Sequence, residues 1–337
     1  MTGFDCRDPA AQQAALAELA EAALALYPLG GSPRATLVNL SENATFRVDG
    51  AANGRRYALR IHRQGYHSRE AIASELAWAQ ALRRSAIVTT PNPTPGRDGA
   101  LIQAMAHPSM DRPRDVVLFD WEAGVEPEIG DDLDGPFETL GAVTARMHGH
   151  ARKWRRPEGF TRLTWDFESS LGEDAPHWGR WRDGMGLDAA KTVMFGRTAD
   201  LIERRLAAYG NGTERFGLVH GDLRLANLLI DGDAVKVIDF DDSGFGWFMY
   251  DAATPVSFYE HEPRVPALID AWVRGYRSVA PLAPEDEAEI PTFVMLRRLL
   301  LVAWIGSHSE TELARSMGVD YTEGTCALCE GYLSRFG

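Results

Sequence analysis

Lysine is nearly absent from this chain of 337 residues. It occurs only at Lys153, Lys191 and Lys236, so the first 152 residues contain none. Lysine and arginine together number 35 against 48 acidic residues, which leaves a formal net charge of -13. Neutralising the phosphates of a nucleic acid requires clustered lysine and arginine. An acidic chain without a basic run is therefore not expected to bind nucleic acid, and neutral or cationic small partners suit its charge better.

Cysteine and long apolar runs are also scarce. The three cysteines, Cys6, Cys326 and Cys329, are too few and too unevenly placed for a disulfide framework, and the N-terminus lacks the pattern of a secretion signal. Uninterrupted apolar runs such as residues 299–305 are far shorter than the roughly 20 residues that span a bilayer. We therefore expect a cytoplasmic protein without a membrane span.

The rest of the composition is that of a folded globular protein. Hydrophobic residues make up 45% of the chain and charged residues 25%, which excludes a disordered or fibrous protein. At roughly 150 residues per domain, the length predicts two domains or one domain with two lobes. The residue patterns place the boundary near residue 120, between an N-terminal lobe of residues 1–119 and a C-terminal lobe of residues 120–337.

The N-terminal lobe has the pattern of a small antiparallel sheet with helices. Alanine and leucine at helical spacing predict one helix over residues 9–27, and an apolar stripe behind a serine cap predicts another over residues 68–84. Turn residues separate the β-prone runs, as in a meander. The predicted strands are residues 35–40, 44–48, 56–62, 100–106 and 116–119.

Helical periodicity dominates the C-terminal lobe after residue 134, with one β hairpin among the helices. The hairpin is predicted from residues 217–220 and 227–230, a turn at residues 231–233 and a strand over residues 234–240. Further helices are predicted over residues 137–147, 201–209, 264–279, 285–306 and 321–335.

The segment 154–186 has no clear period but contains four tryptophans. Two interpretations fit this segment. It is either a loop that covers a binding site or a long connection whose aromatic side chains anchor it to the core.

The hairpin carries the residues with the clearest chemistry. It reads His220-Gly221-Asp222-Leu223-Arg224-Leu225-Ala226-Asn227, and Asp239-Phe240-Asp241 follows at the end of an apolar strand. Phosphoryl transfer needs a carboxylate that orients the attacking hydroxyl and accepts its proton, and amide and carboxylate oxygens that hold Mg²⁺ against the phosphates. Asp222, Asn227 and Asp239 supply these three groups.

These motifs resemble those of the protein kinase-like phosphotransferases, specifically the aminoglycoside phosphotransferase and choline kinase superfamily. Segments 41–48, 57–63 and 74–78 are similar to the branch that holds type II homoserine kinases and the stress-response Ser/Thr kinase. The resemblance spans roughly residues 35–305. It implies an α+β, protein kinase-like two-lobe fold with an antiparallel N-terminal sheet, one helix beside it and a mainly helical C-terminal lobe.

The resemblance implies a role for each residue of the constellation. Asp222 would be the catalytic base or orienting carboxylate, and Asn227 and Asp239 would be Mg²⁺ ligands. Arg224 would either clamp the γ-phosphate or have only a surface role. Asp241 would assist a second metal or meet the substrate.

Three further residues are expected to be structural. His220 would pack beneath the catalytic loop and donate or accept hydrogen bonds there, and Asp251 would fix the loop from the following helix. His148 follows a helix face and is expected to be buried with its hydrogen bonds satisfied.

The family pattern includes a lysine on the third strand that bridges the nucleotide's phosphates and pairs with a helix glutamate. Since this part of the chain has no lysine, Arg60 is the best substitute, with Glu75 as its partner and Glu70 as the alternative. Arginine keeps the charge but differs in geometry, so the nucleotide preference can differ. The phosphate-covering loop has no glycine-rich signature, and Ser41 and Asn43 are expected to hydrogen-bond phosphates there.

We therefore predict an ATP- and Mg²⁺-dependent kinase, a monomer or homodimer, that phosphorylates a hydroxyl of a small molecule such as an amino alcohol, an aminoglycoside or a homoserine-like compound. Two alternatives stay open: a Ser/Thr protein kinase of the stress-response type, and a nucleotide-binding module with weak turnover, which the missing lysine suggests. An enclosed pocket under Trp165, Trp178 and Trp181 would favour a small acceptor. Carboxylates at Asp241, Asp242, Glu260 or Glu262 would suit an amine-bearing acceptor.

Overall fold

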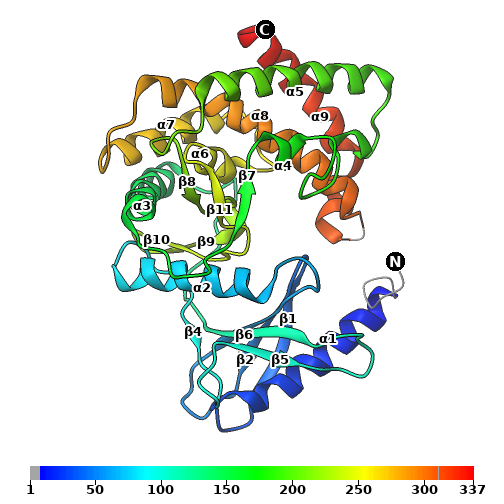
Figure 1. Cartoon of the computed structure of the whole chain (residues 1–337), viewed down its shortest axis with the longest axis vertical. Helices are drawn as coiled ribbons and strands as arrows, with labels where there is room; N and C mark the ends of the chain where they lie inside the picture. Colours follow the sequence, from blue (N-terminus) through cyan, green and yellow to red (C-terminus); the bar gives the residue numbers. More distant parts are fainter. Residues whose placement is uncertain (1–7, 310) are drawn as a thin grey trace. The chain divides into compact units, whose positions relative to one another are not determined.

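The computed structural model describes residues 8–309 and 311–337, so Cys6 lies outside the described residues. The chain forms two compact units, which are described separately (Figure 1). Unit 1 contains the chain up to Ser85, Thr90–Ala123 and Arg156–Thr161, and unit 2 contains Ala86–Thr89, Gly124–Arg155 and Arg162–Gly337.

Unit 1 is built on a six-stranded antiparallel sheet. Its strands run in the order β1-β2-β3-β6-β4, and β5 also pairs with β6. The elements are α1 (Pro9–Ala23), η2 (Leu24–Leu26), β1 (Arg34–Leu40), β2 (Ala44–Asp49), β3 (Tyr57–Ile61), α2 (Arg69–Arg84), β4 (Pro93–Thr94), β5 (Ile102–Met105) and β6 (Arg114–Asp120). The predicted strands and helices of this part are confirmed, except that the proline-rich connector holds the additional short strand β4.

The two faces of this sheet bury different side chains, because successive residues of a strand point to opposite sides. On β6, Val116 and Leu118 join a core that includes Leu19 of α1. Val117 and Phe119 face the other way and join a second core. That second core includes Ile72 and Leu76 of α2 and Ile102 of β5.

Unit 2 is mainly helical. Its helices are α3 (Asp134–Lys153), α4 (Phe167–Leu171), η3 (Trp181–Asp183), α5 (Ala189–Tyr209), η4 (Leu225–Asn227), α6 (Tyr250–Ala253), η5 (Thr254–Val256), α7 (Val265–Arg277), α8 (Pro284–Ser307) and α9 (Glu312–Phe336). The predicted helices are present, although α5 and α9 begin earlier than their patterns indicated, and Gly318 interrupts α9 with a non-helical backbone. The α+β fold predicted from the sequence is confirmed.

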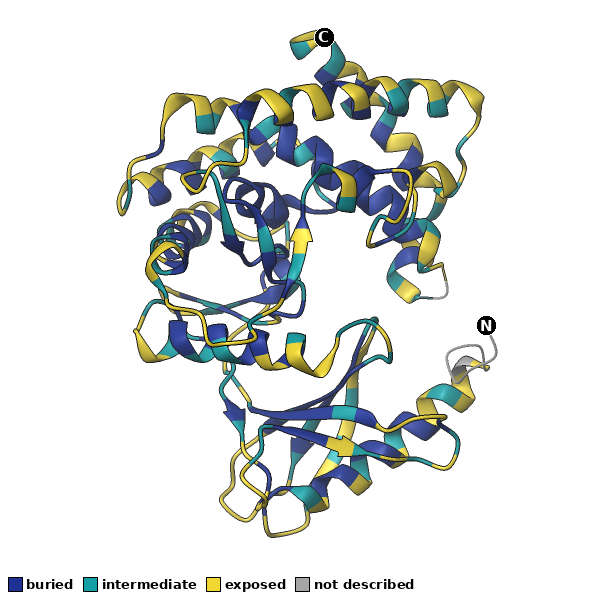
Figure 2. Cartoon of the chain, viewed as in Figure 1, coloured by how far each residue is buried: buried dark blue, intermediate teal, exposed yellow. Residues whose placement is uncertain are grey.

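Helix α8 is the central helix of unit 2 and is buried along most of its length (Figure 2). It is long and apolar enough to cross a membrane, although charged residues interrupt its apolar runs in the sequence. However, 78% of its most apolar part is buried inside the protein. An apolar helix with this burial is typical of a protein core.

Two small sheets complete unit 2, and they correct the predicted hairpin. The hairpin itself consists of β9 (Leu228–Asp231) and β10 (Ala234–Val237). β8 (Phe216–Val219), expected to belong to it, instead pairs with β11 (Gly244–Trp247), which also pairs with β7 (Leu163–Trp165). The prediction missed β7 and β11 because three and four residues are too few to show an alternating pattern.

Candidate active site

The β9–β10 hairpin brings two of the predicted metal ligands to the same end of one ladder. Val237 is opposite Leu228, and the Ile238 N–H donates to the Asn227 carbonyl oxygen at 2.9 Å, which extends the pairing by one residue. Asp239 follows directly. Its φ of +59° lies in the left-handed region that non-glycine residues rarely adopt, and its side chain is exposed.

The Asn227 side chain is oriented by Asp222. Its Nδ2 donates to the Asp222 Oδ2 at 2.7 Å and to the Asp222 carbonyl oxygen at 2.9 Å. These bonds occupy the nitrogen end of the amide, so the oxygen end is the part that can ligate a cation. Among the described residues no three His, Cys, Asp or Glu side chains form a metal cluster. A cation held by Asn227 and Asp239 would take its other ligands from phosphates and water, as Mg²⁺ commonly does.

Asp251 fixes the loop that carries Asp222. Its carboxylate accepts from the backbone N–H groups of His220 at 3.0 Å and Gly221 at 2.8 Å. Gly221 has a φ of +80°, and a Cβ there would lie 2.9 Å from the Asp242 carbonyl oxygen, so this turn requires glycine. The predicted structural role of Asp251 fits this geometry.

Two buried histidines support the same loop. His148 Nε2 lies 3.1 Å from Asp251 Oδ2, and its Nδ1 lies 3.2 Å from the Tyr276 hydroxyl. His220 Nε2 lies 3.2 Å from the Ile238 carbonyl oxygen. Burial lowers the pKa of both imidazoles, although the nearby Asp251 carboxylate partly opposes this. Both therefore act as neutral hydrogen-bonding groups at neutral pH.

Two arginines contact the Asp222 carboxylate. Arg297 of α8, which no sequence motif indicated, donates from Nη2 to Asp222 Oδ1, and Arg224 Nε lies 3.3 Å from Oδ2. Burial alone would raise the pKa of the Asp222 carboxyl, but the charges of Arg297 and Arg224 outweigh it and keep that pKa below its usual value. The carboxylate is therefore ionised and can orient a hydroxyl.

Unit 1 contains the predicted arginine–glutamate pair. Arg60 Nη2 on β3 lies 2.5 Å from Glu75 Oε1 on α2, and both side chains are buried. The Arg60 guanidinium also lies over the Phe119 ring, 5.1 Å from its centroid. Glu70, the alternative partner, is exposed in the first turn of α2.

Ser41 and Asn43 lie in the turn between β1 and β2. The Ser41 N–H donates to the Asn43 carbonyl oxygen at 3.1 Å, and the Asn43 Oδ1 accepts from the Arg63 N–H at 3.1 Å. Ser41 is half-buried and Asn43 is buried. The amide of Asn43 thus links this turn to the end of β3.

The tryptophan-rich segment is anchored rather than open. Trp165, Trp178 and Trp181 are all buried, so they do not line an exposed acceptor surface. The Trp165 Nε1–H donates to the Asp242 carbonyl oxygen at 2.7 Å, and the Arg162 Nε–H donates to the Ser243 carbonyl oxygen at 2.6 Å. The start of the segment therefore holds the loop that follows Asp239.

Glu260, considered for an amine-bearing acceptor, is already engaged. It is buried, and its carboxylate accepts from Arg298 Nη1 at 2.7 Å and from the Tyr321 hydroxyl at 3.1 Å. Glu262 is half-buried and lies 3.7 Å from the imidazole of His261. Neither residue contacts Asp222.

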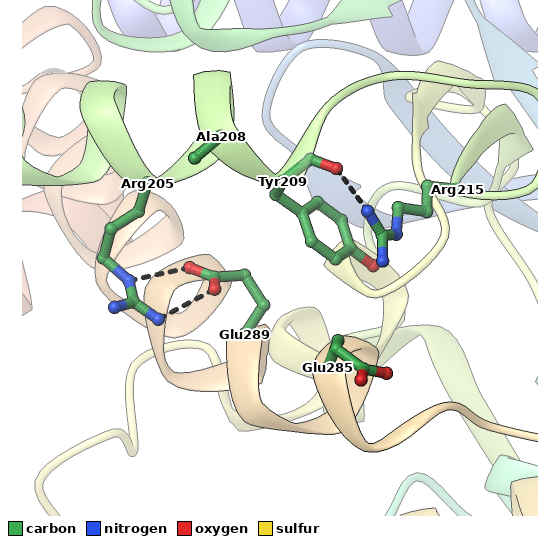
Figure 3. A pocket seen from close by; sticks show the side chains of 6 residues that line it. All are labelled: Arg205, Ala208, Tyr209, Arg215, Glu285 and Glu289. Carbon is green, nitrogen blue, oxygen red and sulfur yellow. Dashed lines mark hydrogen bonds and ion pairs between the residues drawn. The ribbon is translucent and has the colours of Figure 1, made fainter.

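A surface cavity of about 290 Å³ in unit 2 contains none of the predicted site residues (Figure 3). Its cationic side chains are neutralised: Arg205 forms two bonds of 2.8 Å with Glu289, and Arg215 lies 2.9 Å from Asp286. The lining residues are Arg205, Ala208, Tyr209, Arg215, Glu285 and Glu289. We assign no part of the phosphotransfer chemistry to this cavity.

Comparisons with known proteins show the family and the fold of this chain. The model of the phosphotransferase enzyme family matches residues 35–288. The solved structure of a microcompartment-associated aminopropanol kinase superposes with a TM-score of 0.87 at 46% identity, over 95% of this chain and 98% of that one. The amicoumacin kinase of Bacillus subtilis is 25% identical over 73% of this chain and 72% of its own length. An amicoumacin kinase solved with AMP-PNP and Ca²⁺ shares the fold, with a TM-score of 0.73 at 20% identity, over 94% of this chain and 92% of that one.

Proposed function

The chain belongs to the phosphotransferase enzyme family and is a kinase, and from this premise we propose that it transfers the γ-phosphate of ATP, with Mg²⁺, to the hydroxyl of a small amino alcohol. The observation that carries the substrate class is the 46% identity to an aminopropanol kinase over nearly the whole of both chains. The AMP-PNP and Ca²⁺ in the related amicoumacin kinase structure support a nucleotide and a divalent cation.

Asp222 is the proposed catalytic residue. Its ionised carboxylate would accept a hydrogen bond from the acceptor hydroxyl and align the oxygen with the γ-phosphorus. It would take up the proton as the new P–O bond forms and the bond from the γ-phosphorus to the leaving ADP oxygen breaks. The Arg297 and Arg224 guanidinium groups keep this carboxylate ionised. Its contribution is therefore mainly one of orientation, because a weakly basic carboxylate removes a proton only late in the reaction.

The remaining site residues are proposed to bind Mg²⁺ and the negatively charged phosphates. The Asn227 amide oxygen and the Asp239 carboxylate would hold Mg²⁺, whose chemistry is to neutralise charge on the phosphates. Arg224, half-buried beside Asp222, would turn toward the transferred phosphoryl group. Arg60, with Ser41 and Asn43, would bind nucleotide phosphates from unit 1 in place of the missing lysine.

The first experiment measures transfer from radiolabelled ATP to a panel of acceptors. The panel contains aminopropanol, ethanolamine, choline, homoserine, an aminoglycoside and a generic protein substrate. We expect the amino alcohols to have the highest kcat/KM. Labelling of the protein substrate in preference to every small molecule would support the stress-response kinase alternative, and ATP binding without any transfer would support the weak-turnover alternative.

The role of Asp222 is tested by Asp222→Asn in the same assay. Loss of the carboxylate should lower kcat by about 10²–10⁴-fold while the KM for ATP changes little, because a neutral amide orients the hydroxyl less strongly and cannot take up its proton. Asp233→Asn, in the exposed turn of the same hairpin, is the matched control and should keep wild-type turnover. Full activity of Asp222→Asn would overturn the assignment.

A further inference from the structure

Helix α8 contains a fully buried arginine whose charge has a specific partner. Arg297 is 1% exposed and lies among apolar residues of the core helix. An isolated guanidinium in such surroundings is costly, so it must be paired and hydrogen-bonded. Its ionic partner is Asp222, the proposed catalytic carboxylate, 75 residues away in the sequence.

Every part of the Arg297 guanidinium is held in place. Nε donates to Ser257 Oγ at 3.0 Å, and Nη1 donates to the Tyr250 hydroxyl at 3.2 Å. The ring of Trp178 lies 4.9 Å from the guanidinium carbon, and the Trp178 carbonyl oxygen accepts from Ser307 at the end of the same helix. The Arg297 guanidinium therefore has one orientation and cannot rotate toward a ligand.

The two oxygens of Asp222 have different surroundings as a result. Oδ1 accepts from Arg297, which is fixed in the core. Oδ2 accepts from Asn227 and Arg224, which belong to the catalytic loop itself, and the Arg224 side chain is 26% exposed. Only Oδ2 has a partner that can move away when a substrate binds.

We infer that Arg297 is a positioning residue that fixes the rotation of the Asp222 carboxylate, so that Oδ1 stays in the core and Oδ2 is the oxygen that meets the acceptor hydroxyl. This inference rests on the proposed function, because it concerns how Asp222 performs phosphotransfer. A free carboxylate rotates about its Cβ–Cγ bond and presents either oxygen in many directions. Binding one oxygen to a rigid guanidinium removes that freedom before the substrate arrives.

The adjacent residue provides a matched control. Arg298 is equally buried at 1% exposure, but it pairs with Glu260 and donates to Thr325 Oγ1 at 2.7 Å, away from Asp222. Replacing either arginine by methionine removes a buried charge from the same helix. Both variants should lose stability, and only the change at Arg297 should alter turnover per folded molecule.

The experiment compares Arg297→Met, Arg297→Lys and Arg298→Met, with the folded fraction of each measured by circular dichroism. Arg297→Met should lower kcat by about 100-fold with little change in the KM for ATP, since a misplacement of about 1 Å costs a factor of that size. Arg297→Lys keeps the charge but offers no planar fork, so its kcat should lie between those of Arg297→Met and the wild type. Two further variants, Arg297→Ala and Arg298→Ala, leave room for a free guanidinium ion. Added guanidinium should restore part of the kcat of Arg297→Ala and none of that of Arg298→Ala.

Slow ATP hydrolysis without an acceptor is measured in parallel, because water would use the same carboxylate. If the wild type hydrolyses ATP but phosphorylates no amino alcohol, the proposed substrate class fails while the hydrolysis rates still test Arg297. A kcat of Arg297→Met within about threefold of the wild type, in transfer or in hydrolysis, would overturn the inference. A loss in Arg298→Met equal to that in Arg297→Met would overturn it as well.

Discussion

The position of the Arg60 side chain in unit 1 is fixed by the buried carboxylate of Glu75. Its partner Glu75 is 2% exposed, and Arg60 itself is 6% exposed. The attraction between the two charges offsets the cost of desolvating both, so the pair fixes the position of the guanidinium more than it adds stability. An arginine held in this way is rigid, whereas an exposed lysine on its flexible stem is not.

This arrangement predicts an asymmetric response to mutation. Arg60→Met should destabilise the chain by about 3–5 kcal/mol, because Glu75 remains buried without its partner, whereas Arg60→Met with Glu75→Leu should recover most of the loss. The measurement is denaturation in urea. Arg47→Met on the neighbouring strand β2 is the control: Arg47 pairs with Asp49 at 44% side-chain exposure and should contribute less than about 1 kcal/mol. Equal effects of the Arg47 and Arg60 changes would show that burial is not the cause.

Among the elements, helices α3 and α7 approach until their backbones meet. A Cβ at Gly141 of α3 would collide with the Trp272 carbonyl oxygen, and a Cβ at Gly275 of α7 would collide with the Glu138 carbonyl oxygen. Small residues are required on both sides of this crossing. The crossing also bears on the candidate site, because α3 carries His148, which contacts the Asp251 carboxylate that holds the loop before Asp222.

Gly141→Ala should therefore destabilise the protein, by about 1–3 kcal/mol or more, because the obstructing atom is backbone and cannot move aside. Gly149→Ala on the same helix has nothing within 4 Å of the added Cβ and should stabilise it by about 0.5–1 kcal/mol. Thermal unfolding of the two variants distinguishes these outcomes. Equal stability of the two variants would contradict the close crossing.

The first part of the tryptophan-rich segment also holds a loop of the candidate site in place. β7 pairs in parallel with β11, and Arg162 and Trp165 at this strand donate to carbonyl oxygens of residues 241–243. The loop after Asp239 is thereby fixed from a part of the chain about 77 residues earlier. Of the two interpretations of the segment, anchoring to the core is the one that the buried tryptophans favour.

For the whole molecule, ligand binding should be visible as added stability. A nucleotide present at about 100 times its Kd stabilises the folded chain by about 2.7 kcal/mol. We expect ATP with Mg²⁺ to raise the unfolding temperature more than ATP with EDTA, since Asn227 and Asp239 are proposed to hold the cation. Thermal unfolding with and without each ligand provides the measurement.

The variant Asp239→Asn isolates the contribution of the cation. It should lose most of the Mg²⁺-dependent increase in unfolding temperature, because a neutral amide is a weaker ligand than a carboxylate. Asp233→Asn, also exposed and six residues earlier in the same hairpin, should keep the full increment. An unchanged increment in Asp239→Asn would exclude this carboxylate as a ligand.

The features that depend on local patterns could be predicted from the amino-acid sequence. Helical and alternating periodicities located most elements of both units, because those periods follow from backbone geometry. The motif at residues 220–227 and the Asp239 that ends the following strand predicted a shared site. The β9–β10 hairpin brings Asn227 and Asp239 to the same end of its ladder, and Asn227 donates to Asp222. Because the first 152 residues contain no lysine, Arg60 was predicted to take the place of the family's lysine, with Glu75 as its partner. Glu75 is its ionic partner in the structure.

The contacts between groups far apart in the chain became evident only in the folded protein. Arg297 is one of many arginines, and nothing in the apolar pattern around it indicates that it pairs with Asp222. The pairing of β8 with β11 and the burial of the tryptophans likewise depend on how helices and strands far apart in the chain pack together. Such contacts depend on chain topology and on the cost of leaving a buried charge or backbone group unpaired. Local sequence does not encode that cost, because it arises only when the chain folds.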